Sequence, residues 1–186
     1  MAKIYIFRHG ETEDNKEHDF SGIRDVDLDE KGIEQVRQIA QRLKDQKPTI
    51  TYQSDQIRSK QTLNIVLNGY HPNVQIITDP RIRERDYGDL TGLNKDELAK
   101  IDPKDFQLWH RSYDVAPPNG ESIKDVEVRV LDFLNEVVPS WRDDDVIFIS
   151  GHGNSIRPMR RYFEHLSIDQ MCSYEYIPAQ IFEYQI

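Results

Sequence analysis

The stretch that decides the fold is Ile4–Thr12, with the sequence IYIFRHGET. Its first four residues are aliphatic or aromatic, and these residue types favour a pleated, buried surface, so they predict a core strand. The apolar run ends abruptly at Arg8 and His9, and Gly10 then permits a tight turn with close backbone approach. Ligands of open α/β sheets bind outside the carboxyl ends of the strands. The Arg8–His9 pair is therefore predicted to lie at a ligand site.

A second strand of the same kind lies near the other end of the chain. Val146–Ser150 is largely apolar and leads into Gly151, His152 and Gly153. Two predicted strands thus end in a histidine beside glycine, 143 residues apart (152 − 9). One such ending is usually a solvated turn, but a second ending of the same kind supports a shared function. We expect His9 and His152 to face one site.

The composition limits the class of protein. With 186 residues the chain is long enough for one domain with its own core, and we expect residues 1–186 to form it. A formal net charge of −9 argues against a nucleic-acid partner and against binding to a membrane surface. Cys172 is the single cysteine, which excludes disulfide frameworks and cysteine metal clusters. No apolar run reaches the length of a signal peptide or a membrane span, so we expect a cytoplasmic location.

Segments of strand and helix character alternate along the chain. Thr49–Tyr52 and Val74–Ile77 predict further strands, and Gln180–Ile186 alternates like an edge strand. Helical periodicity is found over residues 29–45, with Asp29 as the N-cap, and over residues 57–66, 123–137 and 154–165. Strands that alternate with helices predict an α/β fold, a three-layer, mostly parallel sheet with helices on both faces.

Residues 80–120 are the irregular part of the chain. Arg81–Gly88 carries five charges before a Tyr-Gly turn, and short helices are expected at residues 96–100 and 103–109. Pro117–Gly120 (PPNG) is a strong turn signal. About 40 residues are too few for an independent core. We therefore expect this segment to cover the carboxyl edge of the sheet above the site.

The polar residues at predicted strand ends and first helical turns suit phosphoryl chemistry. Arg8 and Arg58 carry planar guanidinium groups that match a phosphoryl group bidentately. The helix that begins at Asn154 adds backbone N–H donors and a dipole that favours an anion. A neutral imidazole such as that of His9 can attack phosphorus and form a labile N–P bond. Glu84, if buried, could protonate the leaving oxygen.

The same residues also allow plainer interpretations. Charged residues are mostly exposed, so Arg58 taken singly fits a surface charge and Glu84 fits a solvated loop. The other histidines follow no strand end and have no flanking glycine, so most are expected on the surface: His18, His71, His110 and His165. Because neither a His-x-x-x-His spacing nor a glycine-rich nucleotide loop is present, we expect no metal and no nucleotide.

These motifs resemble those of the histidine phosphatase superfamily. Three motifs are similar to ones shared across it: Arg8–Thr12 with Asn15 (the nucleophile), Ser54–Thr62 (the second arginine) and Gly151–Ser155 (the second histidine). Three further stretches are similar to the cofactor-dependent phosphoglycerate mutases in particular: Glu84–Lys95, Arg111–Pro118 and Ile177–Ala179. The resemblance covers nearly the whole chain and implies a phosphoglycerate mutase-like fold.

The resemblance implies a role for each matching residue. His9 would be the phosphorylated nucleophile and Glu84 the proton donor, while Arg8, Arg58 and His152 would hold the phosphoryl group. Other positions would contact phosphate or line the phosphoglycerate pocket: Asn15, Ser21, Gly22, Arg85, Tyr87, Lys95, Arg111, Gly153 and Asn154. The implied reaction interconverts 3- and 2-phosphoglycerate in glycolysis and gluconeogenesis, with 2,3-bisphosphoglycerate as the primer and no metal. The implied partner is a small phosphate ester, and a homodimer is compatible with the resemblance.

Three departures from the mutase pattern leave an alternative open. Mutases usually place two arginines where this chain has His110 and Arg111, and longer mutases carry an insertion between Pro118 and Gly120. The sequence also ends at Ile186 without the basic tail that relatives carry. A less enclosed pocket admits water, so hydrolysis of small phosphate monoesters is the alternative activity. A non-catalytic protein that binds phospho-ligands is a remote third, since all five catalytic positions are present.

Overall fold

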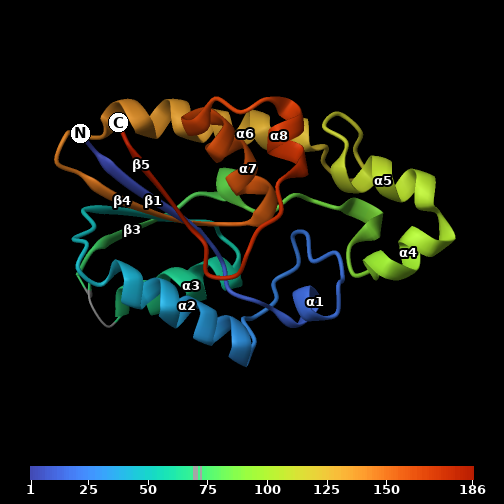
Figure 1. Cartoon of the computed structure of the whole chain (residues 1–186), viewed down its shortest axis with the longest axis horizontal. Coiled ribbons are helices and arrows are strands. Elements are labelled where there is room, and N and C mark those ends of the chain that lie inside the picture. The colour runs from blue at the N-terminus through green and yellow to red at the C-terminus, as the bar shows by residue number, and fades with distance from the viewer. Residues whose placement is uncertain (69–70, 72) are drawn as a thin grey trace.

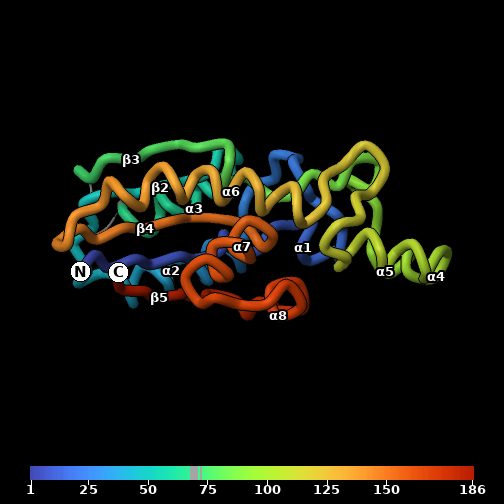
Figure 2. Tube along the Cα trace, turned by 90° about the horizontal axis from the view of Figure 1, so that it is seen from above, coloured from blue at the N-terminus to red at the C-terminus, as the bar shows by residue number. Residues whose placement is uncertain are grey.

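The computed structural model describes residues 1–68, 71 and 73–186. In this part of the chain five strands form one sheet in the order β3-β2-β4-β1-β5, which can be followed in Figure 2. The strands are β1 (Lys3–Arg8), β2 (Ile50–Gln53), β3 (Gln75–Thr78), β4 (Val146–Gly151) and β5 (Ile181–Gln185). The edge strand β5 pairs antiparallel with β1, and the other pairs are parallel.

Helices cover both faces of the sheet (Figure 1). One face carries α2 (Glu30–Leu43) and α3 (Ile57–Asn68), and the other carries α6 (Ile123–Val137) and α7 (Gly153–Glu164). The remaining helices are short: α1 (Glu13–Lys16), α4 (Lys95–Ile101), α5 (Pro103–Arg111) and α8 (Ile168–Ser173), with 3-10 turns at Pro80–Ile82, Gly88–Leu90 and Val138–Ser140. Within the described residues, every helix is too short or too polar to cross a membrane.

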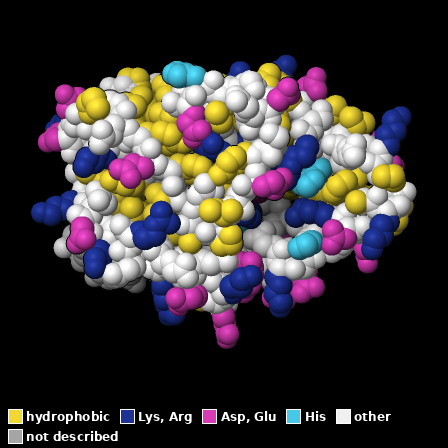
Figure 3. All heavy atoms as spheres, viewed as in Figure 1, with side chains coloured by type: hydrophobic (Ala, Val, Ile, Leu, Met, Phe, Trp, Pro, Cys, Tyr) yellow, Lys and Arg dark blue, Asp and Glu magenta, His cyan; other side chains and the backbone are white. Residues whose placement is uncertain are grey.

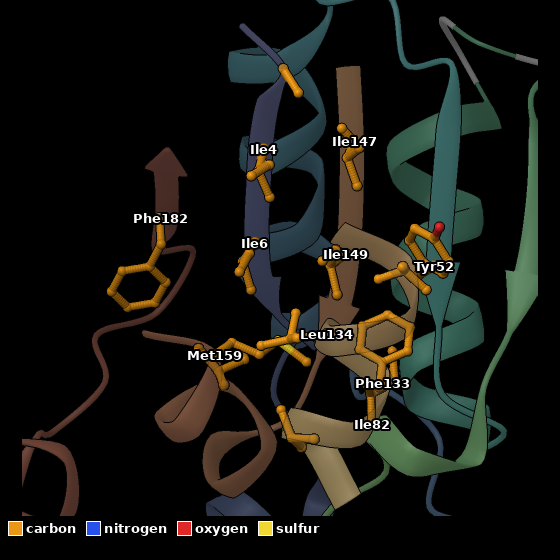
Figure 4. Close-up of a cluster of buried hydrophobic side chains, with 14 of the residues drawn as sticks. Ile4, Ile6, Tyr52, Ile82, Phe133, Leu134, Ile147, Ile149, Met159 and Phe182 are labelled. Carbon is orange, nitrogen blue, oxygen red and sulfur yellow. The ribbon is translucent and has the colours of Figure 1, made fainter. Parts of the chain in front are cut away.

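The central strand β1 divides its side chains between two cores. Ile4 and Ile6 point to the α6–α7 side, where they join Phe133, Leu134, Met159 and the other residues of the cluster drawn in Figure 4. Tyr5 and Phe7 pack on the opposite side against α2 and α3. A strand buried on both faces explains why this stretch is uniformly apolar instead of alternating with polar residues. The predicted α/β class, with a mostly parallel sheet between helical layers, is confirmed.

Local sequence signals predicted the bounds of most helices and strands to within a few residues of those observed. Asp29 caps α2 by accepting a hydrogen bond from Gly32 N at 2.6 Å, and Ser122 forms a capping box at the start of α6. The sequence pattern did not indicate α8. This helix is only six residues long and begins at a capping box formed by Ser167 and Gln170. So short an amphipathic pattern carries little periodic signal.

The segment 80–120 extends beyond the carboxyl ends of the strands, where α4 and α5 project from the body of the sheet (Figures 1 and 2). A small apolar cluster joins it to the loop before α2. Phe20 and Tyr87 form the buried centre of this cluster with Leu90, and side chains of α4 and α5 pack against them. The segment therefore stands beside the edge of the sheet at which His9 and His152 lie.

Candidate active site

A cavity of about 460 Å³ opens at the carboxyl edge of the sheet. On the face drawn in Figure 3 the surface is hollowed, and basic and histidine side chains border the hollow. Most residues singled out from the sequence line this cavity: Arg8, His9, Asn15, Ser21, Gly22, Arg58, Glu84, Tyr87, Lys95, Arg111, Gly153 and Asn154. Two others, Arg85 and His152, lie outside the lining.

The sheet register brings the two histidines together. Strands β1 and β4 are parallel neighbours in which Arg8 pairs with Gly151. A histidine directly follows each strand, and His9 N donates to Gly151 O at 3.1 Å. The two imidazole ring centroids lie 5.1 Å apart. Two histidines far apart in sequence thus become neighbours because their strands are adjacent and end at the same level.

The His9 ring is held in one tautomer. Its Nδ1 lies 2.7 Å from Gly10 O, and a carbonyl oxygen only accepts, so Nδ1 carries the proton. Nε2 therefore keeps its lone pair. Burial, and then the charges of Arg58 and Arg8, hold the pKa of His9 well below its ordinary value. His9 is a neutral imidazole whose free nitrogen can act as a nucleophile.

Arg58 is the cation at that nitrogen. Its Nε donates to His9 Nε2 at 3.3 Å, while Nη1 and Nη2 donate to the carbonyls of Arg24 and Gly22 at 2.7 and 2.8 Å. Gly22 has a φ of 51°, the left-handed region that favours glycine. The guanidinium is fully buried and is held by neutral acceptors, so its positive charge remains effective toward an anion in the cavity.

His152 is oriented from behind the lining. Ser54 Oγ lies 2.7 Å from His152 Nε2 and accepts a hydrogen bond from Gln56 N at 3.2 Å. His152 Nε2 is the one acceptor described for the hydroxyl proton of Ser54, so that proton is directed to Nε2 and the ring proton of His152 lies on Nδ1. That Nδ1 is buried without a hydrogen-bond partner among the described residues. Burial is the main cause that lowers the pKa of His152 well below its ordinary value, so the ring is a neutral donor.

The carboxylate of Glu84 lies at the amino end of α7. Its Oε1 accepts from Arg85 N at 2.7 Å and from Asn154 N at 3.1 Å, while Asn154 Nδ2 donates to Tyr87 Oη at 3.0 Å. The N–H of Asn154 was expected to contact phosphate, but here it holds the carboxylate. Gly153 leaves the other oxygen accessible, because even an added Cβ there would lie 3.6 Å from Glu84 Oε2.

Arg85 departs from the expected position. Its guanidinium is fully buried and donates to backbone carbonyls within segment 80–120 and just after it: His110 O at 3.5 Å, Val115 O at 3.4 Å and Glu121 O at 2.6 Å. The side chain points into segment 80–120 and ties its two ends together. Backbone carbonyls need hydrogen-bond donors, and Arg85 supplies one to each of these three.

A second group of basic residues lines the cavity from α4, α5 and α7. Lys95 Nζ donates to Asp19 O at 2.7 Å, and Arg111 Nη2 pairs with Glu175 Oε1 at 2.6 Å. His110 is half-buried, although most histidines of its group were expected on the surface. It lines the cavity and packs on the rings of Phe20 and Phe106. Burial and then the charges of Arg111 and Lys95 lower the pKa of His110 to about 3, so it adds no charge at neutral pH.

Several lining residues escaped the sequence analysis: Asp19, Gln35, Arg157, Glu175 and Tyr176. Arg157 is 3% exposed and its Nη1 donates to the carbonyls of Met171 and Cys172 at 2.7 and 3.0 Å. Its position three residues after Asn154 on one helix face was an available signal. Tyr176 lies in the segment between α8 and β5. The guanidinium carbon of Arg157 is 5.3 Å from the centroid of its ring. No local pattern marks Tyr176.

The asparagine and serine predicted to bind the ligand keep donor groups for it. Asn15 uses Oδ1 to accept from Thr12 N at 3.3 Å, which leaves its amide nitrogen for an anion. Ser21 Oγ and Arg8 Nε are buried and lack a hydrogen-bond partner among the described residues. Buried donors of this kind are costly unless a ligand binds them. Among the same residues, no group of three or more His, Cys, Asp or Glu side chains is placed to hold a metal ion.

Comparison with known proteins supports the same chemistry. A family model described as the histidine phosphatase superfamily (branch 1) matches residues 4–186. The phosphoglycerate mutase of Schizosaccharomyces pombe is 40% identical over 177 residues, which are 92% of this chain and 84% of that protein. A 2,3-bisphosphoglycerate-dependent phosphoglycerate mutase of Nitrobacter hamburgensis is 37% identical over 177 residues, or 92% of this chain and 86% of that protein.

Solved structures share the fold over almost the whole chain. YhfR of Bacillus stearothermophilus gives a TM-score of 0.87 at 29% identity, covering 98% of this chain and 90% of its own. A mycobacterial glucosyl-3-phosphoglycerate phosphatase in complex with VO3 gives 0.86 at 25% identity, covering 97% and 91%. The family match and the mutase relatives indicate the same family as the two histidines at adjacent strand ends. The chain therefore belongs to the histidine phosphatase superfamily and, within it, to the family of 2,3-bisphosphoglycerate-dependent phosphoglycerate mutases.

Proposed function

We propose that this protein interconverts 3- and 2-phosphoglycerate through a phosphohistidine at His9, with 2,3-bisphosphoglycerate as the primer. The observation that carries the proposal is the pairing of two features in one cavity. A neutral imidazole with its lone pair on Nε2 stands beside Arg8 and Arg58, and further cations, Lys95 and Arg111, line the same cavity from α4 and α5. A phosphate ester with a second anionic group needs the nucleophile with its two arginines for the phosphoryl group and the further cations for the second anionic group.

The proposed chemistry begins with the phosphoryl group bound by Arg8 and Arg58. His9 Nε2 attacks phosphorus, the bond from phosphorus to the ester oxygen breaks, and the leaving oxygen takes a proton from Glu84. The guanidinium groups and the Nδ1–H of His152 stabilise the charge on the phosphoryl oxygens as the bond order changes. Once His9 is phosphorylated, its phosphoryl group passes to the free hydroxyl of bound phosphoglycerate, and Glu84 acts as the base that takes the hydroxyl proton. The freed His9 Nε2 then takes the other phosphoryl group by the step above, which completes the isomerisation.

The residues present fit a doubly phosphorylated primer. The buried donors Arg8 Nε and Ser21 Oγ lack a partner among the described residues and would hold one phosphate. Lys95 and Arg111 would hold the anionic groups farther from His9. When bound, the primer supplies the phosphoryl group that first loads His9.

Hydrolysis is the second candidate function, and His110 favours it. The pKa of about 3 keeps His110 neutral, so the carboxylate side of the cavity has one permanent charge fewer than two arginines would provide. A ligand held less firmly leaves phosphorylated His9 open to water. The similarity in fold to a glucosyl-3-phosphoglycerate phosphatase is consistent with such a reaction on a small phosphate ester.

One assay separates the candidates. Purified protein in excess chelator is given 3-phosphoglycerate with and without 2,3-bisphosphoglycerate, and both 2-phosphoglycerate and inorganic phosphate are measured. We expect isomerisation that depends on the bisphosphate, survives chelation and exceeds phosphate release. If the bisphosphate has no effect and phosphate release dominates on every ester tried, the protein is a phosphatase. Binding of phosphate esters without any turnover would identify a non-catalytic binding protein.

A further inference from the structure

An ion pair bridges two walls of the cavity. Arg111, the last residue of α5, donates from Nη2 to Oε1 of Glu175 at 2.6 Å. Glu175 belongs to the segment between α8 and β5, and both side chains line the cavity. The Glu175 side chain is 74% exposed, so it is held by this contact and not by packing. A protein carboxylate thus already occupies the guanidinium that the proposed function assigns to the carboxylate of the substrate.

We propose that Glu175 is a specificity-determining residue that competes with the substrate carboxylate for Arg111. This inference rests on the proposed function. A phosphate monoester with a carboxylate must displace Glu175 or share Arg111 with it. An ester with a neutral hydroxyl group in the same place leaves the ion pair intact. Glu175 therefore narrows the difference in affinity between carboxylated and uncarboxylated phosphate esters.

The charges around this contact support competition. Arg8 and Arg58 are assigned to the phosphoryl group. Among the described lining residues, the other permanent cations are Lys95, Arg111 and Arg157, whereas His110 is neutral. Other lining carboxylates are engaged elsewhere: Glu11 pairs with Lys31 at 3.0 Å, and Glu84 accepts backbone N–H groups. Asp19 also lines the cavity, and its backbone carbonyl holds Lys95. Among the ion pairs described, Glu175 is the carboxylate that neutralises Arg111.

A matched pair of ligands isolates the effect. 3-Phosphoglycerate and the enantiomer of glycerol 3-phosphate with the same arrangement at C2 differ only in a carboxylate against a CH₂OH group. Their dissociation constants are measured by calorimetry, without primer, for the wild type and for Glu175→Gln. Exposed ion pairs contribute modestly, so we expect Glu175→Gln to bind 3-phosphoglycerate about two- to fivefold more tightly and glycerol 3-phosphate unchanged. The gain should shrink in about 1 M salt, where the Debye length is short.

Glu136→Gln is the matched control. Glu136 is also an exposed carboxylate (68%) paired with a guanidinium, that of Arg81 at 2.8 Å, but neither residue lines the cavity. Its loss changes the net charge equally and should alter neither dissociation constant. A further readout is non-additivity. Arg111→Ala should weaken 3-phosphoglycerate binding more in the Glu175→Gln background, because Arg111 is there free of its competitor.

The outcomes separate this inference from the proposed function. If Glu175→Gln binds both ligands more tightly by the same factor, Glu175 acts only through its general negative charge. If the variant binds both ligands more weakly, Glu175 supports the site instead of competing for it. Either result overturns the inference. Failure of both proteins to bind 3-phosphoglycerate would also overturn it. A shift in the ratio of the two constants, in a protein that does not isomerise phosphoglycerate, would sustain the role of Glu175 and refute the mutase function.

Discussion

Arg58 Nε donates a hydrogen bond to Nε2 of His9 across 3.3 Å. Because His9 Nδ1 is hydrogen-bonded to the carbonyl oxygen of Gly10, Nε2 is the nitrogen that can form a bond to phosphorus. The guanidinium is itself fixed by the carbonyls of Gly22 and Arg24. The end of β1, the first turn of α3 and the loop after α1 therefore meet at one atom. Preorganised charge at the reacting atom is generally the largest contribution to catalysis.

We expect His9→Ala to abolish the phosphoenzyme. Wild-type protein incubated with radiolabelled 2,3-bisphosphoglycerate should retain a label that is labile in acid and stable in alkali, as an N–P bond is. Without the nucleophile the label should be absent and kcat should fall by about four orders of magnitude or more. The exposed His165 offers a control, and His165→Ala should keep both the label and the rate. A label that persists in His9→Ala would place the nucleophile elsewhere.

Ser54→Ala should lower kcat with little change in KM. The Ser54 hydroxyl fixes the proton of His152 on Nδ1, and without it either tautomer can form. By analogy with other groups that orient a catalytic ligand, we expect a loss of about ten- to hundredfold. Thr51→Val is the control, since Thr51 is also fully buried and donates to Gln75 O at 2.7 Å. It should lower stability by about 1 kcal/mol and leave kcat unchanged. Equal losses of kcat in both variants would contradict the positioning role.

Gly10→Ala should destabilise the protein. A Cβ at Gly10 would lie 2.3 Å from Gly32 O, so the amino end of α2 would have to move. Overpacking of this kind costs about 1–3 kcal/mol, measurable by urea unfolding. At Gly153 the nearest atom to an added Cβ is Glu84 Oε2 at 3.6 Å, an ordinary contact. Gly153→Ala should therefore stay within about 1 kcal/mol of the wild type, and similar losses in both variants would refute the packing argument.

His110→Arg should shift the balance from hydrolysis to transfer. The substitution places a permanent charge where the imidazole is neutral, beside Arg111 and Lys95. A hydrogen bond to a charged group contributes about 1.5–3 kcal/mol, which corresponds to roughly tenfold or more in ligand retention. Phosphate release relative to isomerisation should fall accordingly. Lys95→Ala and Arg111→Ala should have the opposite effect, and an unchanged ratio in all three would remove these residues from the substrate-retention site.

Acid should destabilise the protein partly through His110. The unfolded chain takes up a proton on this histidine near its ordinary pKa of 6.5, whereas burial lowers the pKa of His110 in the folded protein to about 3. Below about pH 6.5 the unfolded state therefore binds more protons, and the free energy of unfolding falls as the pH falls. His110→Gln removes this contribution. Its unfolding free energy should decline less steeply between about pH 6.5 and 4, by up to about 1.4 kcal/mol per pH unit. If urea unfolding shows the same decline with pH for the wild type and for His110→Gln, His110 is not held neutral in the folded protein.

The sequence by itself determined the layers and the centre of the site. Apolar runs fixed the strands, periodicity fixed α2 and α6, and capping residues such as Asp29 fixed where helices begin. These are short-range effects of backbone sterics and local hydrogen bonding, so a single segment contains them. His9 and His152 could be assigned to one site because parallel strands present their carboxyl ends on one edge. The adjacency of β1 and β4 turned that expectation into a ring separation of 5.1 Å.

Only the tertiary structure decided how the rest of the site is used. Arg85 was expected in the pocket but binds carbonyls 25 to 36 residues away. His110 belongs to a group of histidines mostly expected at the surface, but it packs against the rings of Phe20 and Phe106. The Arg111–Glu175 pair joins residues 64 positions apart. Such contacts depend on which segments the sheet order and core packing bring together. The direction of a side chain, its burial and hence its charge follow from that packing and leave no local pattern in the sequence.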